Sequence, residues 1–142
     1  MAATDRFRKQ HAELVALVRH IEPWLDPQRA AGDADMVRAL VSALISRLSM
    51  HIAAEDNTLY PRLVQHADAT VRDTARRFVS EMAGVRPTLE AYNLKWGQSE
   101  IIADAAGFCT ETRLVFDLLA DRFSRENAEL YAMIDRLAGA PA

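Results

Sequence analysis

Two histidines and two glutamates lie on the hydrophobic stripes of the chain, where apolar residues recur at three- and four-residue steps: His11, His51, Glu55 and Glu126. Burying an unpaired imidazole or carboxylate costs several kcal/mol, so these groups must satisfy one another or hold a ligand. Imidazole nitrogens and carboxylate oxygens suit iron, manganese or zinc, and helical bundles build such sites from inward-facing side chains. The four residues therefore predict a metal site.

Amphipathic helices would have to position these side chains. The periodicity predicts four helices, which run from after Thr4 to residue 21, from after Asp33 or Asp35 to residue 64, over 69–96, and from Ile101 or Ala105 to residue 137. The 5 Gly and 5 Pro of the chain fall mostly between these helices or near their ends. Pro87 should kink the third helix, because proline removes a backbone donor and crowds the preceding turn. Short connections between four long helices predict an all-α, antiparallel up-down four-helix bundle that forms one domain over residues 1–142.

The composition narrows the class of protein. Lys and Arg number 17 against 20 Asp and Glu, a net charge of −3 that makes nucleic acid a poor partner. Cys109 is the single cysteine, which excludes an intramolecular disulfide and suits a reducing cytoplasm. We recognise no signal sequence or membrane span. We therefore expect no membrane partner. No nucleophile–base set or phosphate-binding loop stands out either, so we expect no enzymatic turnover.

Two segments of the chain have similar sequences, a similarity that we call the echo. Positions 51–60, HIAAEDNTLY, align with positions 122–131, RFSRENAELY. The matched residues are Glu55 with Glu126, Tyr60 with Tyr131, and His51 with Arg122. Because residues four apart share a helix face, each segment turns an ionisable pair toward the interior. We interpret the two tyrosines as core or end-cap aromatics.

The motifs QHAEL at 10–14 and MHIAAEDNTLYPRL at 50–63 resemble the hemerythrin-like, or HHE cation-binding, domain family. Its pattern is a histidine on the first helix and HxxxE with an LYP-type ending on the second. The resemblance implies a four-helix bundle with a non-haem di-iron centre bridged by two carboxylates, used in oxygen binding, in iron or oxygen sensing, or in redox stress. It also implies ligand roles for the four residues named above, the two glutamates being the bridges.

The second half of the chain departs from that family pattern. The family places a histidine on the third helix where this chain has Met82, with Arg86 one turn further on, and another on the fourth helix where it has Arg122. All the missing donors would have served the same ion. The resemblance therefore implies that one metal position is lost, while the other keeps a four-ligand shell.

Two arrangements of the polar residues remain open. In one, a single iron, zinc or manganese ion lies among the four ligand candidates, with Arg122 beside them. In the other, Arg122, with or without Arg86, neutralises both carboxylates, the histidines hydrogen-bond to them, and no metal binds. The strength of bidentate arginine–carboxylate pairing slightly favours this second arrangement. Either arrangement makes the protein a hemerythrin-like binding or sensing domain with a degenerate centre.

Two other functions are compatible with the sequence. The bundle could be a structural or regulatory module that binds an unidentified protein partner, which a large exposed apolar patch would favour. Non-covalent haem, held by a histidine and Met82 between helices, is a further alternative. The bulky residues of the hydrophobic stripes disfavour it, because the core would need a cavity large enough for a macrocycle.

Overall fold

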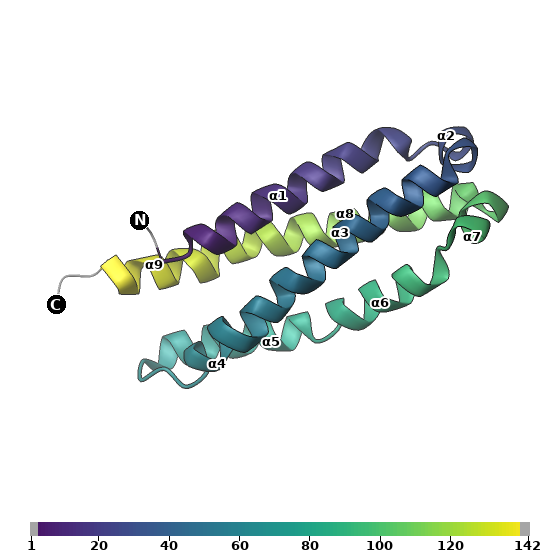
Figure 1. Cartoon of the computed structure of the whole chain (residues 1–142). Coiled ribbons are helices and arrows are strands. Elements are labelled where there is room, and N and C mark those ends of the chain that lie inside the picture. The colour runs from purple at the N-terminus through teal and green to yellow at the C-terminus, as the bar shows by residue number, and fades with distance from the viewer. Residues whose placement is uncertain (1–2, 140–142) are drawn as a thin grey trace.

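The computed structural model describes residues 3–139, and every regular element in that range is helical. Four long helical rods run antiparallel to their neighbours, which confirms the bundle predicted from periodicity (Figure 1). The described chain begins and ends at the same end of the bundle. Residues 1–2 and 140–142 of the predicted domain lie outside the described residues.

The rods are built from shorter elements. The first is α1 (Asp5–Ile21), followed by the 3-10 turn η1 (Glu22–Trp24). The second joins α3 (Ala34–Ala54), the π-helical turn η2 (Glu55–Leu59) and α4 (Tyr60–Leu63). The third comprises α5 (Ala69–Met82) and α6 (Val85–Lys95). The fourth joins α8 (Ala105–Arg125), the π-helical turn η3 (Glu126–Tyr131) and α9 (Ala132–Gly139).

Two short helices close the end of the bundle opposite the termini. They are α2 (Pro27–Gly32) and α7 (Gln98–Ala103) (Figure 1). The sequence predicts only a connection where the first lies, and it predicts the start of the fourth helix within or just after the second. Helix α2 begins with a side-chain cap, because Asp26 accepts a hydrogen bond from the Arg29 backbone N–H and Pro27 occupies the first turn. This short start signal lies inside a proline-containing segment that otherwise indicates a loop.

The third rod is interrupted rather than kinked. Helix α5 ends at Met82, Ala83 and Gly84 form a turn, and α6 begins at Val85. Pro87 lies in the first turn of α6, where its missing N–H is tolerated. The same missing N–H leaves the Ala83 carbonyl without an α-helical partner, so the break precedes the proline by one turn.

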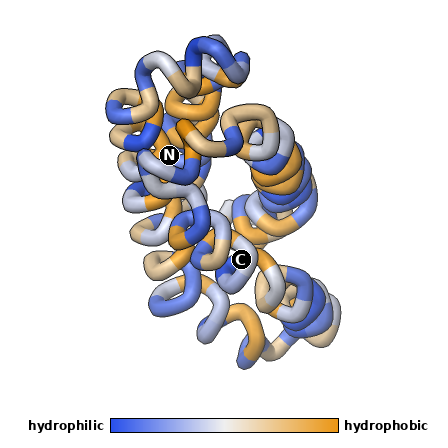
Figure 2. Tube along the Cα trace, turned by 90° about the vertical axis from the view of Figure 1, so that its right-hand side faces the viewer, coloured by the Kyte–Doolittle hydropathy of each residue, from blue (hydrophilic) through white to orange (hydrophobic). Residues whose placement is uncertain are grey.

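A layer of buried polar residues, here called the polar layer, divides the hydrophobic core; it contains His11, His51, Glu55, Arg122 and Glu126. Buried residues of one cluster lie toward α2 and α7, and those of a second cluster lie toward the chain termini. In α1, for example, Leu14 belongs to the first cluster and Phe7 to the second, with His11 between them. Figure 2 shows hydrophobic and hydrophilic residues alternating around the turns of the helices, as in amphipathic helices.

The second rod, Ala34–Leu63, is long and apolar enough to cross a membrane by length and composition alone, although we recognise no such run in the sequence. This is weak evidence for a membrane span, because the core helix of a bundle passes the same test. In this structure the rod contributes Val41, Leu44 and Leu48 to the core.

Candidate metal centre

Each candidate glutamate begins a π-helical turn. Glu55 is the first residue of η2 and Glu126 the first of η3. A π turn carries one residue more than an α turn, so it re-aims the side chains that follow, and such turns recur at functional sites. In the second rod Pro61 assists the change, because it has no N–H for the Asn57 carbonyl. The echo between the two segments thus corresponds to the same local structure on two rods.

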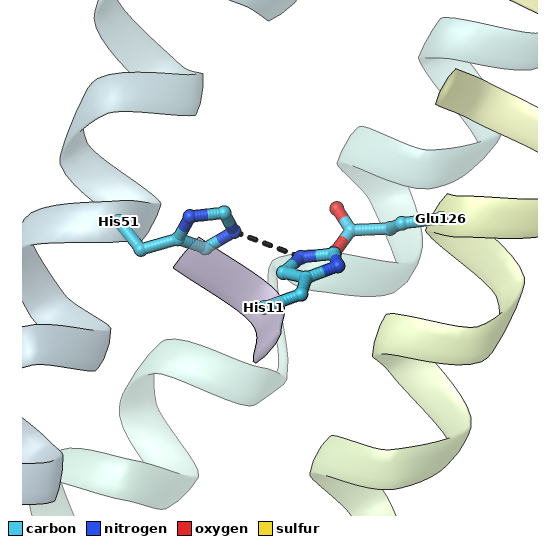
Figure 3. A group of neighbouring side chains, drawn as sticks. All are labelled: His11, His51 and Glu126. Carbon is cyan, nitrogen blue, oxygen red and sulfur yellow. Dashed lines mark hydrogen bonds and ion pairs between the residues drawn. The ribbon is translucent and has the colours of Figure 1, made fainter. Parts of the chain in front are cut away.

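Three side chains from three rods meet in the polar layer and form a group that could hold a metal ion (Figure 3). The Nε2 atoms of His11 and His51 are 3.0 Å apart. His11 Nε2 also lies 3.2 Å from Glu126 Oε1. One ligand atom from each residue lies within 4.8 Å of the others, and all three residues are buried.

Glu55 lies beside this group without being one of its three members, and its Oε1 is 3.1 Å from His51 Nε2. Glu55 Oε1 and Glu126 Oε1 are both buried and have no hydrogen-bond partner. Buried carboxylate oxygens without partners are costly, and a cation coordinated by them would remove that cost. The nitrogen and oxygen donors therefore fit a first-row transition metal or zinc. Three of the four residues that the sequence predicts as ligands are members of the group, and the fourth, Glu55, lies next to it.

The other oxygen of each glutamate is held by a tyrosine from the opposite rod. Tyr131, at the end of η3, donates to Glu55 Oε2 across 2.8 Å. Tyr60, which follows η2, donates to Glu126 Oε2 across 3.0 Å. The hydroxyl of Tyr131 is also 3.2 Å from His11 Nε2. Each carboxylate is thus oriented by one phenol, with its second oxygen facing a histidine.

Arg122 is buried beside the group but does not form the bidentate carboxylate pairing expected in the metal-free arrangement. Its Nη2 donates to the Phe78 carbonyl across 3.0 Å and to the Tyr60 hydroxyl across 3.2 Å. Its Nη1 donates to Glu81 Oε2 across 3.4 Å. Only Nε faces Glu126, at 3.7 Å from Oε2, and this Nε has no hydrogen-bond partner. The guanidinium therefore places a fixed positive charge next to Glu126.

The remaining two positions of the family pattern lie away from the carboxylates. Arg86 is exposed and pairs with Asp56 at 3.4 Å, so the expectation that it neutralises the buried glutamates is wrong. It projects from α6 beyond the break before Pro87, on the surface of the bundle. Met82 is half-buried and packs against the larger hydrophobic cluster.

The pKa values of the two glutamates are shifted in opposite directions. Burial and the negative charge of Glu126 raise the pKa of Glu55 to about 9. Burial also opposes ionisation of Glu126, but the contact of its Oε1 with His11 and the charge of Arg122 hold its pKa below the usual value. Burial lowers the pKa of His51 and raises those of Tyr60 and Tyr131. At neutral pH without metal, the site therefore holds one carboxylate and one neutral carboxylic acid.

Sequence reasoning missed four residues that contact the centre. Tyr60 and Tyr131 are hydrogen-bond donors rather than plain core aromatics. In the two similar segments Tyr60 follows Glu55 at the same sequence spacing as Tyr131 follows Glu126, and this shared spacing is the signal that could have identified them. Gln10 and Asn127 contact the histidines. Each precedes or follows a candidate ligand directly in the chain, but adjacency alone does not predict a contact.

An all-helical bundle with a buried His, His and Glu group belongs to the class of helical proteins that can hold a metal between their helices. The family model described as hemerythrin HHE cation binding domain matches residues 2–134, so the chain belongs to that family. No curated protein and no solved structure matches the chain.

Proposed function

We propose that this protein binds one divalent transition metal ion in its polar layer, iron being the first candidate and zinc or manganese the alternatives. His11, His51 and Glu126 would hold the ion, and Glu55 would supply the fourth donor. The observation that carries the proposal is the pair of buried, unpartnered Oε1 atoms of Glu55 and Glu126, each close to a histidine Nε2. Such a set of lone pairs attracts a cation.

A single ion is proposed because a guanidinium lies where further donors would be needed for a second one. Arg122 cannot ligate a cation and stays protonated. Its Nη2 contacts Tyr60 and its Nε faces Glu126 Oε2, so its charge balances this carboxylate on the side away from His11. The dinuclear chemistry that the family resemblance implies, reversible oxygen binding included, is therefore not proposed for this chain.

We propose a binding or sensing role without turnover, in the cytoplasm. An ion held here would supply redox or Lewis-acid chemistry, while the protein residues fix its ligands and keep the Tyr60 and Tyr131 phenols protonated. Support for the compartment comes from Cys109, which is free and buried.

Metal analysis tests the proposal. Protein purified without a tag or chelator would be analysed for metals, then incubated anaerobically with ferrous iron, zinc or manganese and analysed again. We expect about one ion per chain, lost in His51→Ala and Glu126→Gln, because each change removes a donor from the group. His66→Ala is the matched control, since His66 lies in the loop between α4 and α5.

Two outcomes would overturn this function. Two ions per chain would show that Arg122 does not exclude the second position. No ion under any condition would leave a bundle whose polar layer is balanced by its own residues, and the function would then have to be sought in a protein partner.

A further inference from the structure

The outward-facing nitrogens of both candidate histidine ligands contact side-chain amide oxygens. His51 Nδ1 lies 2.7 Å from Gln10 Oε1. His11 Nδ1 lies 3.0 Å from Asn127 Oδ1. The two amides come from different rods, α1 and η3, and neither residue contributes a donor atom to the metal-ligand group. The two rings are therefore held in the same way from opposite sides.

An amide oxygen can accept a hydrogen bond but cannot donate one. Each Nδ1 must therefore carry the proton of its hydrogen bond, which leaves the Nε2 lone pair of a neutral ring free. The two Nε2 atoms face each other and the carboxylates. Their 3.0 Å contact is a hydrogen bond, so one of the two must also carry a proton in the metal-free protein, and an ion that binds both rings would displace this proton. The amide oxygen that accepts from Nδ1 of each ring thus determines that Nε2 is the nitrogen available to a metal ion.

Each amide also lines a surface cleft together with its histidine. Gln10 and His51 line a cleft of about 370 Å³ between α1 and α3, beside Glu13 and Arg47. Asn127 and His11 line a second cleft, of about 440 Å³, between α1 and the fourth rod. Water in either cleft could offer Nδ1 a donor or an acceptor, whereas the amide oxygen offers only an acceptor. The protein side chain therefore selects one tautomer where solvent would not.

We propose that Gln10 and Asn127 are positioning residues that hold the Nδ1 protons of His51 and His11 and so direct both Nε2 atoms at the metal. Partners of this kind fix the orientation and basicity of ligand imidazoles. The inference rests on the proposed metal-binding function for its purpose. The tautomer that it assigns is a property of the metal-free protein and can be measured separately.

Nitrogen NMR of the metal-free protein, labelled with ¹⁵N in histidine, tests the assignment. Long-range proton–nitrogen spectra distinguish a ring nitrogen that carries a proton from one that does not. We expect protonated Nδ1 in His11 and His51 at a pH well above the ordinary pKa of histidine. His66 is an internal reference of opposite kind, because its Nδ1 accepts a hydrogen bond from the Asp68 backbone N–H. An unprotonated Nδ1 in His11 or His51 would overturn the proposal.

Variants of Gln10 separate positioning from packing. Gln10→Leu keeps the size but removes the acceptor, so His51 should lose its single tautomer and metal affinity should fall about 10- to 100-fold. Gln10→Glu keeps an oxygen acceptor in a half-buried position, and should retain the Nδ1 proton and the affinity. Asn127→Leu and Asn127→Asp form the same pair for His11. Gln28→Leu, on the exposed face of α2, is the matched control.

The outcomes separate this inference from the proposed function. If the wild-type protein binds no metal but shows protonated Nδ1 atoms that Gln10→Leu and Asn127→Leu release, the positioning stands and the metal function fails. If metal binds and the leucine variants change neither tautomer nor affinity, the metal function stands and the positioning role is refuted. The wild-type spectrum and the acidic variants decide the matter even if a leucine variant does not fold.

Discussion

Tyr131 donates its phenolic proton to Oε2 of Glu55 across 2.8 Å, joining the end of one π-helical turn to the start of the other. Tyr60 and Glu126 form the reciprocal pair at 3.0 Å. Each of the two rods therefore supplies the phenol that donates to the glutamate of the other rod. In both glutamates the Oε1 atom is left facing a histidine. This crossing explains how two similar sequence segments produce one site.

Removing one phenol should affect both stability and metal affinity. Tyr131→Phe removes the only hydrogen-bond donor that the described residues offer to Glu55 Oε2, and so leaves a second oxygen of this buried carboxyl group without a partner. We expect the free energy of unfolding to fall by about 1–3 kcal/mol. Metal affinity should fall as well, because Glu55 would no longer be oriented. Chemical denaturation and metal titration measure the two effects.

Tyr92→Phe is the matched control for this change. The Tyr92 hydroxyl is hydrogen-bonded to Thr112 Oγ1 at 2.6 Å, in the core but apart from the metal-ligand group. This variant should lose stability without losing metal affinity. Equal effects of the two variants on affinity would contradict the orienting role of Tyr131.

The stability of the metal-free protein should decrease as pH rises from about 6.5 to 9. The pKa of Glu55 lies near 9 in the folded state and near 4.5 when unfolded, so the folded state binds more protons between these values. Stability then falls with rising pH, by at most about 1.4 kcal/mol per pH unit for one group. Below pH 6.5 the lowered pKa of His51 acts in the opposite direction, since its neutral form is favoured by folding.

Thermal or urea denaturation across this pH range measures the effect, and Glu55→Gln should abolish the slope above pH 6.5. Metal uptake by the wild-type protein should release a proton near neutral pH, because an ion bound by Glu55 requires its carboxylate form. Calorimetry in buffers of different ionisation enthalpy would detect that proton. Uptake without proton release would mean that Glu55 stays protonated and is not a ligand.

Arg122→His should strengthen iron binding. The substitution replaces a fixed cation by an imidazole four residues before Glu126, as His51 precedes Glu55. We expect a higher iron content per chain than in the parent protein, measured after anaerobic incubation with ferrous iron. Arg125→His is the control, because Arg125 is paired with Glu81 at the edge of the site. If Arg122→His binds no more iron than the parent, Arg122 does not stand in for a metal ion.

A helix cap far from the site should contribute to stability alone. Asp104 accepts a hydrogen bond from the Gly107 backbone N–H at the start of α8. Asp104→Ala should lower the free energy of unfolding by about 0.5–2 kcal/mol, because this N–H loses its partner. Metal content at saturation should not change. A parallel loss of metal would show that the start of α8 also positions the polar layer.

The four rods could be predicted from sequence because they depend on periodic burial, which is a local pattern along each helix. Pro87 predicts a kink in the third helix, but the structure has a full break at Ala83 and Gly84, in the turn whose carbonyl the proline leaves without a partner. Periodicity does not predict α2 and does not separate α7 from α8, because six-residue helices carry too little periodicity and depend on caps and on packing.

The sequence by itself determined which ionisable residues must be buried, since His11, His51, Glu55, Arg122 and Glu126 share stripes with apolar residues that have to leave water. Only the tertiary structure decided how those residues pair. Arg122 turns most of its donors to Phe78, Tyr60 and Glu81, and Arg86 stays at the surface. Hydrogen bonds depend on distances of a few tenths of an ångström between rods, and helical periodicity sets only the face on which a residue lies.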